Sequence, residues 1–456
     1  MQQFTTDELF SRLSKLIMEF CETLKKSKDK DFTRTRKLPL ERLLATILHL
    51  CASSSNDGVD IKLNEFFKQS RRSGLWENAA APHRSALTKA RKKIDWTVFE
   101  KLLIAINALA NELFPKRSEY FWNGLSVYAF DGSKFTLPAT SDIRAFFDAK
   151  SGLENKGKGH YPQALVNTVY DVFRRMPVGR TITPIDDGNE REEAKKLLDF
   201  LPQWCICLFD RGYPSYDFVA ELLLQSSRYF IMRCPVASTF SAVKDFIASK
   251  KQSDLIYLIP SSGQFAKKLC KKKQRALKAI QLRIILLKHP DGTSSVLLTN
   301  LPEKKEFSNA EIINLYYRRW AVENHYRDEK CSFLVENFHS KSVDGIQQEL
   351  FAILINAVLA RLMTALSVES ESIETKKCLV MPQLKNAVKS LAQDIAVFVS
   401  RNLEKAIVIF HELLDQIRAV KYYKSKISKS SKPRVNKASA NKWQVKRKSK
   451  TVGVHA

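Results

Sequence analysis

The spacing of apolar residues predicts helices from the N-terminus to about residue 115. The stretches ELFSRLSKLIMEFCETL, LPLERLLATILHL and VDIKLNEFFKQS place apolar residues three and four apart, which is the helical period. SSSNDG interrupts this period and predicts a break between the last two. The basic and then apolar stretch PHRSALTKARKKIDWTVFEKLLIAINAL completes the helical part.

From about residue 122 the pattern changes to strands that alternate with helices. GLSVYAFDGSKFTLP, YPQALVNTVYDV and GRTITP predict three strands, and NEREEAKKLLDFLP predicts a helix that Pro202 closes. QWCICLFD predicts a buried strand, YDFVAELLLQ a helix and RYFIMRCP another strand. This order predicts a mixed α/β sheet.

The pattern becomes β-rich after residue 235 and helical again near residue 308. IQLRIILLKHPDGTSSVLLTNLP, with its PDG turn, predicts a hairpin region inserted into the α/β pattern. Ser308 and Glu311 have the spacing of a capping box and predict the start of a long helix containing LYYRRWAVENHYRDEK. The apolar helix LFAILINAVLARLMTAL follows, and further helices run to about residue 420.

The end of the chain has a composition that cannot bury a core. Lys421 to Lys450 hold twelve Lys or Arg and no acid, which predicts a disordered basic tail for DNA backbone contact. We therefore predict an N-terminal helical region, a first part of an α/β core, a β-rich insertion, a second part of the core, a C-terminal helical region and the tail, at residues 1–120, 121–235, 236–305, 306–360, 361–420 and 421–456.

Net charge narrows the classes of function. The chain has 75 Lys and Arg against 48 Asp and Glu, a formal charge of +27, which predicts a polyanionic partner and most commonly nucleic acid. The eight Cys include no CxxC pair, and no apolar run suits a signal peptide or a bilayer span. We expect a cytoplasmic protein with reduced cysteines and no membrane partner.

Basic residues gather towards the end of the N-terminal helices. Seven Lys or Arg and one Glu lie between residues 71 and 93, the basic ones being Arg71, Arg72, Arg84, Lys89, Arg91, Lys92 and Lys93. Short helices that end in a basic one suit a helix-turn-helix-like DNA-binding module. A helical bundle with a solvated basic face is the alternative.

Three acids stand out by their positions. Asp131 is expected where one apolar strand ends (VYAFDGS), and Asp210 where another ends (CICLFDRGY). Residues at the carboxyl ends of strands line the crevice where α/β sheets bind ligands. With Glu323 on the long helix they form the kind of oxygen-ligand set that Mg²⁺ prefers. Aspartate is also a common turn residue, so the combination and not either Asp alone supports the hypothesis.

The long helix has an unusual face. At about 100° per residue, Tyr316, Arg319, Glu323 and Lys330 fall within one stripe about 60° wide. A seam containing Arg, Glu and Lys is not core, and a charged ladder is the simpler alternative. The more specific interpretation is a functional face, on which Glu323 binds a metal ion and Arg319 and Lys330 bind phosphates.

Neighbouring residues of the same helix are interpreted differently. Trp320 lies on the same side of the helix as the stripe. It is expected either to stack on an unpaired base or to pack in the core. Asp328 and Glu329 lie away from the stripe and are expected in solvent.

The spacing Tyr-x2-Arg-x3-Glu-x6-Lys of the stripe resembles the YREK signature of the insertion-sequence-four transposases, which are bacterial DDE enzymes. The resemblance covers about residues 40–425 and implies a ribonuclease-H-like core. In that core FDGS at Asp131 matches the first Asp, at the end of the first strand, and FDRGY at Asp210 matches the second, at the end of the fourth. Glu323 matches the glutamate that follows a β-rich insertion.

This resemblance implies a DNA transposase of the bacterial cytoplasm and nucleoid that acts on double-stranded DNA with terminal inverted repeats and on target DNA. A homodimer in a synaptic complex is implied as well. The three carboxylates would bind two Mg²⁺ or Mn²⁺ ions for in-line phosphodiester attack. Tyr316, Arg319 and Lys330 would hold phosphates near the scissile bond.

Two other classes of protein share part of this pattern. A related ribonuclease-H-like nuclease or resolvase would not need the YREK stripe. A domesticated, non-catalytic DNA-binding protein would not need all three carboxylates, which are intact here.

Overall fold

The computed structural model describes residues 5–27, 31–32, 37–52, 57–114, 118–149, 161–224, 228–236, 240–259, 279–288, 292–367 and 378–425. The N-terminal region is helical, as the apolar spacing predicted, with helices α1 (Thr6–Lys26), α2 (Leu40–Ala52), α3 (Val59–Arg72), α4 (Arg84–Arg91) and α5 (Thr97–Leu113). Helix α1 begins at a capping box in which Thr5 and Glu8 bond each other's backbone N–H groups.

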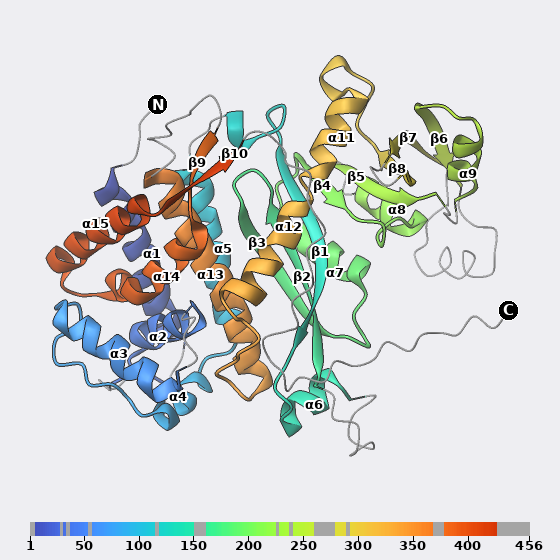
Figure 1. Cartoon of the computed structure of the whole chain (residues 1–456). Helices are drawn as coiled ribbons and strands as arrows, with labels where there is room; N and C mark the ends of the chain where they lie inside the picture. Colours follow the sequence, from blue (N-terminus) through green and yellow to red (C-terminus); the bar gives the residue numbers. More distant parts are fainter. Residues whose placement is uncertain are drawn as a thin grey trace.

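An eight-stranded mixed sheet forms the centre of the molecule, in the order β3-β2-β1-β4-β5-β8-β7-β6 (Figure 1). Its first five strands are β1 (Ser126–Thr136), β2 (Gln163–Asp171), β3 (Met176–Pro184), β4 (Cys205–Phe209) and β5 (Arg228–Pro235). Strands β1 to β3 are antiparallel neighbours, whereas β4 is parallel to β1 and β5 is parallel to β4. This order and these directions make the ribonuclease-H-like core that was expected.

Helices connect the core strands and cover the sheet. They are α6 (Ser141–Phe147), α7 (Glu190–Leu198) and α8 (Tyr216–Leu224). Helix α7 follows β3 and packs on β2 and β3. Its residues Ala194, Leu197 and Leu198 are buried in the core. Three glutamates in its first turn complement the helix dipole.

The β-rich region after β5 extends the same sheet. It contains α9 (Ser241–Ala248), β6 (Ser253–Leu258), β7 (Ile280–Lys288) and β8 (Ser294–Thr299). Strand β8 pairs antiparallel with β5, so the insertion continues the core through a shared edge. Figure 1 shows β6 and α9 at the far end of the sheet from the terminal helices.

The helical regions at the two ends of the chain, predicted as separate segments, pack together. The C-terminal elements are α13 (Val343–Ser367), β9 (Cys378–Pro382), α14 (Leu384–Asp394), η5 (Ile395–Val399), α15 (Leu403–Ala419) and β10 (Lys421–Ser425). Helix α13 contacts α2, α5 and α14 as well as β3, so it joins the helical layer to the sheet (Figure 1). Its segment Val343–Ala365 is long and apolar enough to span a membrane, but the most apolar part of that segment is wholly buried inside the protein.

The first residues of the predicted disordered tail, residues 421–456, are ordered in the structure. Its first five residues form β10, which pairs with β9, because β9 offers an antiparallel edge that the local composition does not reveal. Residues 426–456 lie outside the described part of the chain.

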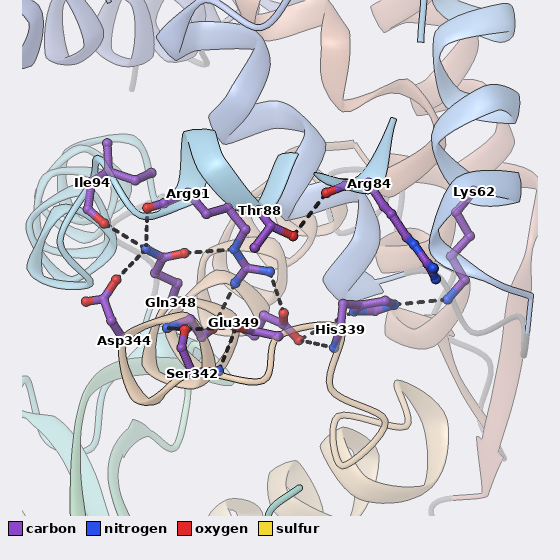
Figure 2. Close-up of polar contacts among 12 residues, drawn as sticks. Lys62, Arg84, Thr88, Arg91, Ile94, His339, Ser342, Asp344, Gln348 and Glu349 are labelled. Carbon is purple, nitrogen blue, oxygen red and sulfur yellow. Dashed lines mark hydrogen bonds and ion pairs between the residues drawn. The ribbon is translucent and has the colours of Figure 1, made fainter. Parts of the chain in front are cut away.

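A buried polar network ties α4 to α13 and changes the interpretation of one basic residue (Figure 2). Arg91 was counted with the solvated or DNA-binding basic residues, but it is only 6% exposed. Its guanidinium donates to Glu349 Oε1 at 2.7 Å, to Gln348 Oε1 at 3.0 Å and to the Gly345 carbonyl at 2.8 Å. Arg91 therefore joins the helical layer internally. The prediction was wrong because a charge count does not show which face of a short helix is covered.

The single long helix predicted after Ser308 is also interrupted. It consists of α11 (Asn309–Tyr317), α12 (Trp320–Arg327) and a π-helical segment, η3 (Asp328–Ser332). Between α11 and α12 the backbone bonds are of the tighter i to i−3 kind, and η3 is wound more loosely. The even spacing of 100° per residue therefore does not hold along this segment.

Candidate active site

The two aspartates reach one edge of the sheet from neighbouring strands. Asp210 directly follows β4, as expected. Asp131 lies within β1, because pairing with β2 continues as far as Thr136, and the Asp-Gly pair is not a turn. The pairing of β1 with β4 ends at Ala129, however, so Asp131 lies just beyond the part of β1 that β4 covers. Both carboxylates thus come from the carboxyl ends of the paired parallel segments.

Arg319 lies among all three predicted acids. Its Nη1 is 3.9 Å from Asp131 Oδ1, its Nη2 is 3.9 Å from Asp210 Oδ2, and Nη2 is 2.5 Å from Glu323 Oε1. The guanidinium is almost fully buried, whereas the three carboxylates are between 21 and 32% exposed. Carboxylates from β1, the loop after β4 and α12 therefore form one cluster that is open to solvent.

The other residues of the predicted stripe surround this cluster unequally. The Tyr316 hydroxyl donates to Asp210 Oδ1 at 3.4 Å. Lys330 Nζ lies beside β1, donating to Ser133 Oγ at 2.8 Å and to the Lys134 carbonyl at 2.6 Å. Trp320 is 53% exposed, so the core-packing alternative does not apply to it.

Electrostatics distinguishes the cluster from ordinary ion pairs. Burial raises the pKa of Asp131 to about 7; the charges of Glu323 and Asp210 add to the rise, although Arg319 opposes it. Burial and the charge of Asp210 likewise raise the pKa of Glu190, at the start of α7. The negative charges at this edge are therefore not fully compensated by the protein's own cations.

The donor set fits a hard divalent cation. In the described part of the chain no three His, Cys, Asp or Glu side chains stand together as a ready metal site, and at this edge the Arg319 guanidinium contacts each of the three acids. Three carboxylates with incompletely compensated charge are nevertheless the ligands that Mg²⁺ and Mn²⁺ prefer.

Several residues at the site were not selected from the sequence. Arg233 on β5 pairs with Asp210 Oδ1 at 2.9 Å. The Tyr326 hydroxyl lies within hydrogen-bond distance of two carbonyl oxygens that share its proton, those of Asp131 at 2.8 Å and Val166 at 2.9 Å. Tyr326 follows Glu323 by three residues, so helical spacing could have suggested it, whereas Arg233 depends on strand order.

Glu329 was expected in solvent, and that prediction was wrong. The residue is fully buried, and its two oxygens accept from Arg180 Nη2 at 2.7 and 2.8 Å. Despite burial, Arg180 and His325 lower the pKa of Glu329 to about 2. Asp328 is half-buried as well. Glu329 follows the buried residues Val322, His325 and Tyr326 at helical spacing, so it continues the buried face of α12.

Comparisons with known proteins agree with this architecture. The family model described as "Transposase DDE domain" matches residues 122–359. The transposase InsG of insertion sequence element IS4, from Escherichia coli (strain K12), is 22% identical over 280 residues, which are 61% of this chain. The matched part spans 60% of that relative's length.

Among solved structures, the chain is similar to a piggyBac transposase in a synaptic complex with hairpin DNA. That likeness has a TM-score of 0.43 at 12% identity, covering 96% of this chain and 87% of the other. Because the family model covers more than half of the sequence, this chain belongs to the transposase DDE domain family, with a likeness to the IS4 transposase.

Proposed function

We propose that the protein is a DNA transposase that cleaves the ends of a mobile element and joins them to target DNA. The observation that supports this most is the convergence of Asp131, Asp210 and Glu323 on one guanidinium. Structural ion pairs need one acid for each base, and three acids from three separate elements are in excess of that need.

Transposase DDE domains in general depend on divalent metal ions. Asp131, Asp210 and Glu323 would hold two Mg²⁺ or Mn²⁺ ions, which when bound activate water and stabilise the attacking and leaving oxygens of phosphodiester transfer. The three acids are partly exposed, which leaves room for a DNA strand to reach them.

The cations around the acids would position the DNA. Arg319 offers a planar guanidinium suited to phosphate, and Lys330 and the Tyr316 hydroxyl lie on either side of it along the helical segment. The exposed ring of Trp320 is available to stack on an unpaired base.

DNA remote from the cleavage point would bind the basic helical layer. Among the basic residues at positions 71–93, those exposed to solvent are Arg71, Arg72, Arg84, Lys89 and Lys92. They lie on or next to α3 and α4, and the buried contacts of Arg91 tie α4 to α13 (Figure 2). Recognition of terminal inverted repeats and a synaptic homodimer belong to the same proposal.

The test is cleavage of the element's end DNA by the purified chain with and without Mg²⁺. We expect metal-dependent nicking at the end, and we expect Glu323→Gln to lose it while keeping end binding in a gel-shift assay. Glu311→Gln, an exposed acid on α11, is the matched control and should cleave normally.

Two results would contradict the proposal. Unimpaired cleavage by Glu323→Gln would remove the site assignment. Specific binding without cleavage by the unaltered chain, in any divalent metal, would indicate a non-catalytic DNA-binding protein.

A further inference from the structure

Glu190 lies between the two segments that hold the catalytic aspartates. It is the first residue of α7, whose N-cap is Asn189. A Cβ atom built at Gly132, next to Asp131, would lie 2.7 Å from Glu190 Oε1. A Cβ atom built at Gly212, in the loop after Asp210, would lie 3.5 Å from Oε2. The carboxylate therefore lies close to the chain beside both aspartates.

A second polar side chain reaches the same point. Asn167 faces Gly132 across the β1–β2 pair, and its Oδ1 would be 2.8 Å from a Cβ atom on that glycine. The side chain is 1% exposed, and neither its oxygen nor its nitrogen has a hydrogen-bond partner. Leaving buried amide groups unpaired is costly, so this position is unfavourable unless a ligand supplies the missing bonds.

Glycine at position 132 keeps this space open. Any other residue would place its Cβ atom closer than 3.0 Å to both Glu190 and Asn167. Gly132 therefore allows these two polar side chains to approach the backbone next to Asp131.

The other acids of α7 have ordinary partners. Glu192 pairs with Lys195 at 2.9 Å, and Glu193 pairs with Lys196 at 2.8 Å. Among the described residues no hydrogen bond or ion pair engages the Glu190 carboxylate. Its position beside the active site is thus not explained by pairing within the helix.

We propose that Glu190 is a fourth acidic ligand of the active site, which binds a divalent metal ion together with Asp131 and Asp210, with the Asn167 amide as a polar neighbour. This inference rests on the proposed function. Carboxylate oxygens from β1, the loop after β4 and the start of α7 then face one ion, which is the ligand type that Mg²⁺ and Mn²⁺ take.

The test measures metal binding by the full-length chain, apart from its activity. Mn²⁺ is titrated into the protein, and the free ion is followed by its electron paramagnetic resonance signal. We expect Glu190→Gln to weaken Mn²⁺ binding roughly tenfold or more, the scale of losing a group that supports a metal. Glu190→Asp, which keeps the charge, should bind with intermediate affinity. Glu192→Gln, on the exposed side of the same helix, is the matched control.

The outcomes separate the two proposals. Unchanged Mn²⁺ affinity in Glu190→Gln, with Glu323→Gln weakened and the unaltered chain cleaving DNA, overturns the role of Glu190 alone. Failure of the unaltered chain to bind Mn²⁺ and to cleave overturns the proposed function itself. Weaker Mn²⁺ binding with an unchanged melting temperature and unchanged end-DNA affinity supports the fourth ligand, because a merely structural role would lower the melting temperature.

Discussion

Two groups of acids beside the sheet differ in how completely their charges are paired. Glu329 is fully buried, and both of its oxygens accept hydrogen bonds from Arg180. That arginine also donates to the hydroxyl of Thr168 at 3.2 Å and to the carbonyl of Leu350 at 2.8 Å. The low pKa of Glu329, about 2, is the signature of a charge that the fold stabilises.

The candidate active site shows the opposite condition. Arg319 is just as buried as Arg180, yet its Nε and Nη1 have no hydrogen-bond partner. The pKa of Asp131 is raised to about 7, which is the signature of a charge that the fold destabilises. We call an ion pair saturated when its charged groups have their hydrogen bonds made within the protein, and such pairs stabilise the fold. A cluster whose charged groups lack some of these bonds is unsaturated and can still bind a ligand.

The largest expected effect separates the two groups by stability. Glu329→Gln leaves the charge of Arg180 buried and unpaired, so we expect the free energy of unfolding to fall by about 3–5 kcal/mol. Urea denaturation measures it. The double variant Arg180→Met with Glu329→Met removes both charges and should recover most of the loss. A change under about 1 kcal/mol for Glu329→Gln would show that the pair is not structural.

The same acid-to-amide change at the active site should act on activity. Asp131→Asn at pH 8 removes a charge that the fold disfavours, so the free energy of unfolding should stay the same or rise. Cleavage of end DNA should fall by more than about a hundredfold, the scale of losing a group that stabilises the transition state. A loss of stability like that of Glu329→Gln would erase the distinction between the two groups.

Acid pH should weaken the saturated pairs. The pKa values of Glu329 and Glu349 are lowered from 4.5 to about 2, so each contributes stability that is present above 4.5. That stability is lost as the pH falls from 4.5 towards 2. Urea denaturation between pH 6 and pH 3 should show a steep decline that is shallower in Glu329→Gln. If stability fell equally steeply with pH in the unaltered chain and in Glu329→Gln, the Glu329 carboxylate would not be the group that stabilises the fold.

The smallest effect on stability is expected at the exposed ring beside the cluster. Trp320→Ala should change the free energy of unfolding by no more than about 0.5 kcal/mol, as surface substitutions usually do. Affinity for ends with unpaired bases should fall by about 1–3 kcal/mol, and affinity for intact duplex should not. Equal losses on both DNA forms would rule out base stacking. Tyr317→Ala, at a neighbouring half-exposed ring, is the control.

Local pattern was enough to predict much of the fold and the main acids. The periods of 2 and 3.6 residues are set by neighbouring residues, so the helices, the core strands and their order were predictable. Asp131, Asp210 and Glu323 could be selected because strand ends and helix spacing are also local features. Their association across β1, β4 and α12 was expected from the resemblance to the insertion-sequence-four transposases.

Only the tertiary structure decided which charges are buried and which stay open. Glu329 lies on the buried face of the helical segment, three residues after Tyr326, and its partner Arg180 lies 149 residues earlier in the chain. Arg91 and Glu190 were likewise misjudged or overlooked, since their neighbours come from distant segments. A charged side chain can be buried only if folding brings partners to it. These partners are distant in the sequence, so the local spacing of residues does not predict them.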